Sequence, residues 1–152
     1  MNEELNEQPR DGIFKRVAKL EPNWDKLPRV GFGDLVLDTE TLLVVLKEGP
    51  DTGTDRLQSV ALTQSEMEIL RLLIILSDVQ STFGAVVSTP EFQEWLDYRV
   101  RIPKGGVNAI GNSTRVEDNM LISLRKKLRS LPGNRVTLVN TYKSRWHLER
   151  SS

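Results

Sequence analysis

The 152-residue sequence contains no cysteine and only one histidine, His147. It therefore has no disulfide framework, thiolate metal site or histidine cluster. No apolar run is long enough to span a bilayer, and residues 1–12 lack the basic start and apolar middle of a signal peptide. Glycine-rich phosphate loops, nucleophile elbows and metal-ligand spacings are missing as well. We expect a cytoplasmic protein that is not an enzyme and uses no metal or cofactor.

The chain also has no net charge, because 21 Lys/Arg balance 21 Asp/Glu. The two signs are separated along the chain. From Arg99 to the end there are twelve Lys/Arg and three Asp/Glu, a net charge of +9, which leaves −9 on the residues before it. A one-sided charge of this size is typical of a surface that binds an anionic partner. Lysines on a solvated helix face give the same pattern, so this second interpretation stays open.

The length fits one domain with a short extension. We predict a flexible tail at residues 1–30, with a candidate docking segment at residues 13–30, and a domain at residues 31–150. Residues 1–12 are polar and without periodicity, and the apolar spacing of residues 13–20 fits only one or two helical turns. Trp24 has two interpretations of equal weight: it caps the core or it anchors a partner.

A small antiparallel sheet is predicted first in the domain. Residues 32–37, 42–46 and 57–62 have the apolar, β-rich or alternating character of strands. Asp38, Thr39 and Glu40 have the composition of a turn between the first two.

Three capping-box patterns, each a hydroxyl residue followed three positions later by glutamate, predict three helices. The patterns begin at Thr63, Ser88 and Thr114. The predicted helices span about residues 63–79, 90–98 and 115–130, and two strands at residues 136–139 and 146–148 follow around a basic turn.

The third helix has a clear apolar face. Glu117, Leu121, Leu124 and Leu128 recur at helical spacing, with Val116 beside the stripe. We expect Trp95 and Trp146 in the core, and His147 in a structural or surface role rather than as a base.

Five stretches, in this order, resemble the OmpR/PhoB family of response-regulator DNA-binding domains. FGDLVLD resembles the opening strand, ALTQSEMEILRLLI the first helix, VVSTPEFQEWLD the second, TRVEDNMLISLRKKL the recognition helix and LVNTYKSRWHL the wing. The resemblance covers about residues 30–149.

The resemblance implies an α+β winged helix-turn-helix fold, with a small N-terminal antiparallel sheet, three helices and a C-terminal β-hairpin wing. It implies that double-stranded DNA is the partner, with the third helix in the major groove and the wing at the adjacent minor groove and backbone. It also implies that the loop at residues 98–112 faces RNA polymerase. We expect no receiver domain, because residues 1–30 are too few for one, and hence no control by aspartyl phosphorylation within the chain.

The sequence departs from the family at the wing tip. Lys143 and Arg145 stand where the family has glycines, and Tyr142 stands where it has an arginine. Without the positive-φ freedom of glycine the hairpin tip must differ. We expect the DNA target to differ too, since Ile122 and Ser123 replace polar or basic residues of the family helix.

The face of the third helix opposite its apolar stripe carries the predicted contacts. Asn119 can bond an adenine and Ile122 can pack on a thymine methyl group, whereas Lys126 suits a phosphate. The nearby Arg99, Arg101 and Lys104 fit DNA or polymerase equally well. The predicted DNA-binding residues are Arg115, Asn119, Ile122, Ser123, Arg125, Lys126, Lys127, Arg129, Tyr142, Lys143, Ser144 and Arg145.

Three functions compete. The first is a sequence-specific transcription regulator, bacterial or phage-encoded, and nucleoid-associated if it binds DNA. The second is a winged-helix module that binds RNA polymerase or another regulator without reading DNA. The third, weaker, is a DNA-organising or replication-initiation factor. Control would come through abundance, through partner proteins or through the N-terminal segment. Residues 13–30 are the candidate site for a homodimer or a partner protein, in place of the dimerisation that a receiver domain gives.

Overall fold

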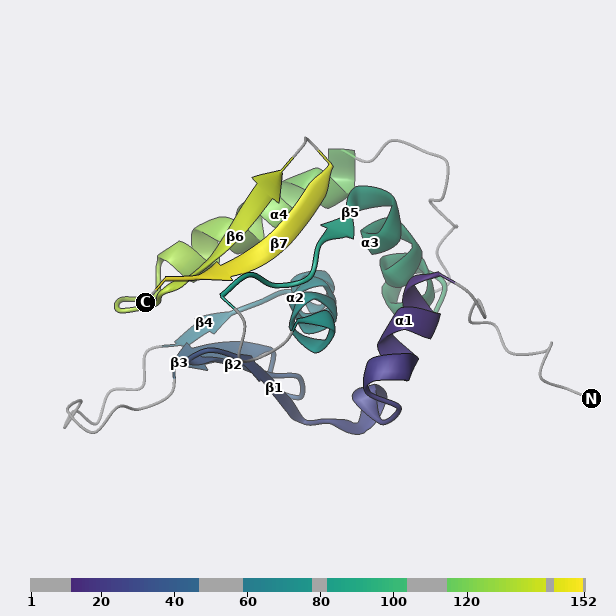
Figure 1. Ribbon diagram of the computed structural model, residues 1–152, viewed down its shortest axis with the longest axis horizontal. Coiled ribbons are helices and arrows are strands. Elements are labelled where there is room, and N and C mark those ends of the chain that lie inside the picture. The colour runs from purple at the N-terminus through teal and green to yellow at the C-terminus, as the bar shows by residue number, and fades with distance from the viewer. Residues whose placement is uncertain (1–11, 47–58, 78–81, 104–114, 142–143, 152) are drawn as a thin grey trace, which may run out of the picture.

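The computed structural model describes residues 12–46, 59–77, 82–103, 115–141 and 144–151 (Figure 1). In chain order the elements are α1 (Ile13–Leu20), η2 (Trp24–Lys26), β1 (Arg29–Phe32), β2 (Leu35–Asp38), β3 (Leu43–Leu46), β4 (Ser59–Ala61), α2 (Gln64–Leu76), β5 (Val87–Ser88), α3 (Thr89–Leu96), the π-helical turn η3 (Asp97–Arg101), α4 (Arg115–Arg129), β6 (Val136–Thr141) and β7 (Arg145–Arg150). No helix in these ranges combines the length and the apolar composition that crossing a membrane requires.

The N-terminal sheet is antiparallel in the order β1-β2-β3-β4, one strand more than the sequence predicts. The predicted strand at residues 32–37 is divided by a turn at Gly33, whose φ of 61° suits glycine. The residues before that turn form β1 and pair with β2. The sheet buries Phe32, Leu35 and Leu37 completely, and α2 lies over it (Figure 1).

Two of the three predicted capping boxes form. At the start of α2 the Thr63 hydroxyl accepts the Glu66 N–H at 3.1 Å, and the Glu66 carboxylate accepts the Thr63 N–H at 2.9 Å. Ser88 and Glu91 make the same exchange at the start of α3. The predicted third cap, Thr114, lies outside the described residues. The helix ends differ slightly from prediction, because α2 ends at Leu76 and α3 continues into η3.

Helix α4 and the C-terminal hairpin complete the fold. The predicted face of α4 is confirmed, since Leu121, Leu124 and Leu128 are fully buried. Strands β6 and β7 are longer than predicted, and β5 adds a third strand in the order β5-β7-β6. The helices α2, α3 and α4 followed by this hairpin form a winged helix-turn-helix, so the predicted α+β fold class is confirmed.

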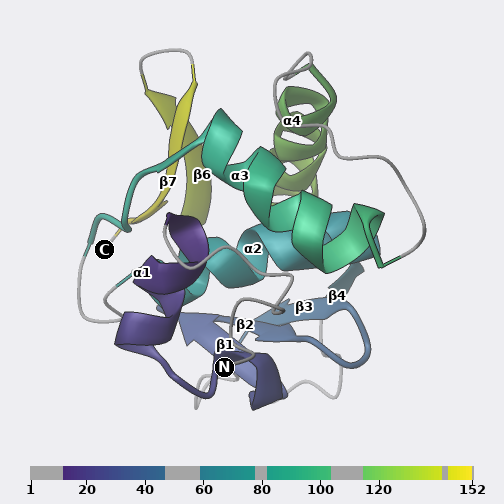
Figure 2. The same cartoon turned by 90° about the vertical axis from the view of Figure 1, so that its right-hand side faces the viewer.

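The residues predicted as a tail are packed into the core from Ile13 onward. Ile13, Phe14 and Val17 on α1 are buried, and Figure 2 shows α1 beside α3. The ring of Phe14 stacks on Trp95 with centroids 4.5 Å apart, and the Trp24 ring centroid lies 4.9 Å from that of Trp95. Trp24 therefore caps the core. A helix this short is stable only through packing, which its own sequence does not reveal.

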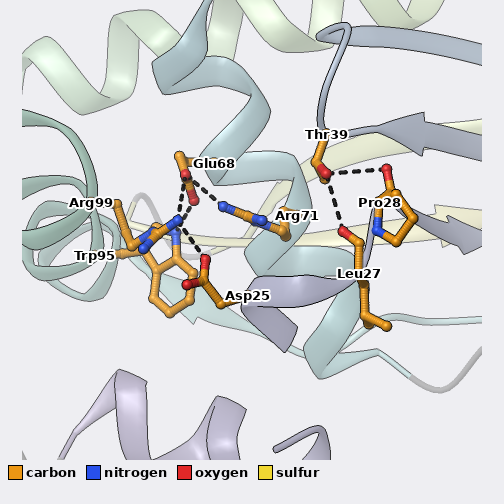
Figure 3. Close-up of polar contacts among 8 residues, drawn as sticks. All are labelled: Asp25, Leu27, Pro28, Thr39, Glu68, Arg71, Trp95 and Arg99. Atoms are coloured by element: carbon orange, nitrogen blue, oxygen red, sulfur yellow. Dashed lines mark hydrogen bonds and ion pairs between the residues drawn. The ribbon is translucent and has the colours of Figure 1, made fainter. Parts of the chain in front are cut away.

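Buried charges on α2 and η3 form a network that reaches the N-terminal segment through Asp25 (Figure 3). The Glu68 carboxylate, 1% exposed, accepts bonds from the Trp95 indole at 3.2 Å and the Arg71 guanidinium at 2.6 Å. Arg99 bridges Glu68 at 3.3 Å and Asp25 at 2.9 Å. If Asp25 is removed, Arg99 keeps its buried partner Glu68, so the exposed Arg99–Asp25 pair adds only modestly to the attachment of the N-terminal segment.

Aromatic and backbone contacts complete this attachment. The guanidinium of Arg99 lies 4.8 Å from the centroid of the Trp24 ring, within cation–π range. The Thr39 hydroxyl lies 3.1 Å from each of the Leu27 and Pro28 carbonyl oxygens (Figure 3). These contacts hold the segment between α1 and β1 at Trp24, Leu27 and Pro28.

Candidate nucleic-acid interface

The face of α4 opposite the buried leucines is polar and accessible. Asn119, Lys126 and Arg129 are exposed there, and within the part of the chain that the structure describes none of the three is in an ion pair or a side-chain hydrogen bond. Arg115 begins the same helix, and its side chain lies outside the described part. The donors of these side chains face solvent, where a polar partner can bond them.

Two other predicted contact residues are bonded within the chain. Ser123 donates to one Glu66 oxygen at 2.7 Å, and the Lys127 ammonium donates to the other at 2.5 Å. Burial raises the pKa of the Glu66 carboxyl, but the bonds from Lys127, Thr63 and Ser123 outweigh it and leave this pKa lowered. Glu66 stays ionised and fastens α4 to the first turn of α2.

The opposite flank of α4 faces the wing. The Arg125 guanidinium lies 5.5 Å from the centroid of the Trp146 ring, which is almost fully buried. Ile122, expected on the contact face, is only partly exposed and packs against the core. Val116, expected beside the core stripe, is instead 53% exposed, because the helix turns it away from the core. It is the apolar residue that α4 leaves most accessible.

The start of α4 is tied to η3. Glu117, 1% exposed, accepts hydrogen bonds from the Gln93 amide and the Arg101 guanidinium. Arg101 also bonds Asp97 at 2.9 Å. Burial alone lowers the pKa of Arg101, but its bonds to Asp97 and Glu117 outweigh this effect and raise it. Arg101 and Arg99 thus pair with carboxylates of this chain, although the sequence pattern suits them equally to DNA or polymerase.

The wing presents Ser144 and Arg145, both exposed. Tyr142 and Lys143 lie outside the described residues, as do residues 104–112 of the loop expected to face polymerase. The Ser144 carbonyl accepts the Thr89 N–H at 2.8 Å. The wing is therefore joined directly to the first residue of α3, a link that sequence spacing alone does not show.

The single histidine of the chain is bonded within the wing. The two ring nitrogens of His147 lie 3.2 Å from the Thr141 hydroxyl and 2.7 Å from a Glu149 oxygen, which matches the structural role expected of it. No cluster of three metal-ligating side chains occurs within those ranges. The arrangement suits binding through hydrogen bonds and charge.

Neither a scan against protein-family models nor a search of curated proteins gives a match to this chain. Among solved structures, the chain is similar to the DNA-binding domain of the response regulator AdeR in its complex with an intercistronic region. The TM-score is 0.49 and the sequence identity 20%, over 79% of this chain and 98% of that one. The fold assignment above depends on the topology of this chain and not on this similarity.

Proposed function

We propose that this protein is a sequence-specific DNA-binding transcription regulator. The observation that carries the proposal is the difference between the two sides of α4. One side docks on the core through three buried leucines, while Asn119, Lys126 and Arg129 are exposed on the other. An α-helix fits the major groove of B-DNA, and exposed polar groups on its outer face are what reading base edges requires.

The proposed contacts fall into two groups on α4. Asn119 reads a base edge, while Arg115, Lys126 and Arg129 bind phosphates. Ile122, being half-buried, contributes at most its exposed atoms to a thymine methyl group. Ser123, Lys127 and Arg125 are in neither group, because they hold α4 against α2 and the wing.

The wing supplies the remaining contacts. Arg145 is exposed at the start of β7 and enters the adjacent minor groove or binds its phosphates. Tyr142, Lys143 and Ser144 are proposed to act with it. A helix and a wing that reach different grooves bind together more tightly when the protein holds their separation fixed.

Two substitutions on α4 test the proposal. Lys126→Ala should weaken binding to all DNA sequences alike and lower the slope of log affinity against log salt by about 1. Asn119→Ala should keep that slope and relax preference at one base position, by about 1–3 kcal/mol if the contact is bidentate. DNA titrations over a range of salt concentrations measure both effects. Lys126→Ala binding that equals wild type at every salt concentration removes α4 from the interface.

A protein-interaction module is the second candidate. It is favoured by exposed apolar side chains, since Phe83 is 62% and Val116 53% exposed. The partner would be RNA polymerase or another regulator. Purified protein that binds RNA polymerase but no DNA above background would select this function.

A partner that docks through residues 13–30 would meet little apolar surface. Phe14, Val17 and Trp24 are used inside the chain, and Leu20, 61% exposed, is the large apolar side chain that α1 leaves accessible. A homodimer at this segment therefore stays a proposal with a small apolar area to support it.

A further inference from the structure

Thr89 bonds to both parts of the proposed interface, the wing and α4. It is the first residue of α3 and 1% exposed. Its N–H donates to the Ser144 carbonyl of the wing at 2.8 Å. Its hydroxyl lies 3.2 Å from that same carbonyl and 3.2 Å from a carboxylate oxygen of Asp118, in the first turn of α4.

The backbone N–H and the hydroxyl of Thr89 have different consequences. The backbone bond extends the β5-β7 ladder, in which Ser88 pairs with Arg145, and any residue except proline can make it. The hydroxyl is different, because it reaches both the wing and α4. With one proton to donate, it is shared between two acceptors, and both of these hydrogen bonds are partly buried.

We infer that Thr89 is a positioning residue for DNA binding, which sets the wing relative to α4 through Ser144 and Asp118. This inference rests on the proposed function. A wing and a helix on one rigid body bind as linked sites, and the second contact forms at high effective concentration. Without the Thr89 hydroxyl the wing keeps its ladder and its packing against α4, but it loses the link from Ser144 through Thr89 to Asp118, so Arg145 contributes less to binding.

Thr89→Val removes the hydroxyl at nearly equal volume and leaves the backbone bond, and Thr89→Ser restores the hydroxyl. We expect Thr89→Val to weaken DNA binding by about 3- to 10-fold and Thr89→Ser to bind like wild type. The decisive readout is coupling. Arg145→Ala should cost little in the Thr89→Val background, whereas Lys126→Ala should cost the same factor in both backgrounds. If Thr89 only stabilised the fold, Thr89→Val would not lower the cost of Arg145→Ala while leaving the cost of Lys126→Ala unchanged.

A second pair of variants tests the link from the other side. Asp118→Ala and Asp118→Asn remove the same charge, but only asparagine keeps an oxygen that accepts from Thr89. We expect Asp118→Ala to bind DNA more weakly than Asp118→Asn. We also expect Arg145→Ala to cost little affinity in the Asp118→Ala background, as in the Thr89→Val background. This comparison remains informative if Thr89→Val does not fold, as thermal unfolding would reveal.

The outcomes separate the inference from the function beneath it. Wild-type protein that binds no DNA overturns the proposed function and this inference together. If the wild-type protein binds DNA and Thr89→Val binds it with the same affinity, the inference alone is overturned. It is also overturned if the effects of Thr89→Val and Arg145→Ala on affinity multiply independently. Equal affinities of Asp118→Ala and Asp118→Asn overturn it as well.

Discussion

At the scale of single residues, the role of a side chain depends on its environment in the fold more than on its position in the chain. Lys126 and Lys127 are neighbours in a run of basic residues, and the sequence treats them alike. In the folded chain Lys126 is exposed, while the Lys127 ammonium bonds Glu66 at 2.5 Å. One helical step of about 100° separates solvent from the contact between α4 and α2.

These two lysines provide a matched pair of substitutions. Lys127→Ala should lower the free energy of unfolding by about 1–2 kcal/mol, since it removes a charged hydrogen bond that solvent partly screens. Lys126→Ala should change that free energy by less than about 0.5 kcal/mol. Urea unfolding of both variants measures the difference. Equal stabilities would mean that the Glu66 contact does not hold α4 in place.

At the scale of elements, the N-terminal segment differs most from expectation. Residues 13–27 close one side of the core through Phe14 and Trp24, and Arg99 adds an ion pair to Asp25. The segment behaves as part of the domain and not as an appendage.

Trp24→Ala tests this attachment. It should lower the free energy of unfolding by about 3–4 kcal/mol, because it opens a large cavity and removes the ring beneath Arg99. Leu20→Ala, on the same segment but 61% exposed, should cost less than about 0.5 kcal/mol. Calorimetric or urea unfolding checks both. A Trp24→Ala variant as stable as Leu20→Ala would show that the segment is dispensable.

Local signals explain which elements the sequence predicts well. The starts of α2 and α3 are encoded by capping boxes, and the buried face of α4 by its leucine spacing, so short windows suffice. Strand β1 and helix α1 are short and depend on partners distant in sequence. The orientation of Val116 and the bonds of Thr89 likewise depend on tertiary packing, which periodicity does not contain.

At the scale of the whole molecule, the opposite charges of the two halves meet inside the fold. Acidic groups of the first half pair with bases of the second, as Glu66 does with Lys127 and Glu68 with Arg99. Lys126, Arg129 and Arg145 are exposed on α4 and the wing. Part of the charge asymmetry therefore builds the scaffold, and the remainder defines the proposed DNA surface.

The most direct test of DNA reading is selection from a random pool of double-stranded DNA by the purified full-length chain. Affinities of the selected sequences and of scrambled controls would then be measured over a range of salt concentrations. We predict an enriched motif, bound far more tightly than scrambled DNA, and affinities that fall steeply with salt for both. Weak binding without a motif, or no binding even at low salt, would contradict the account and direct the search to a protein partner.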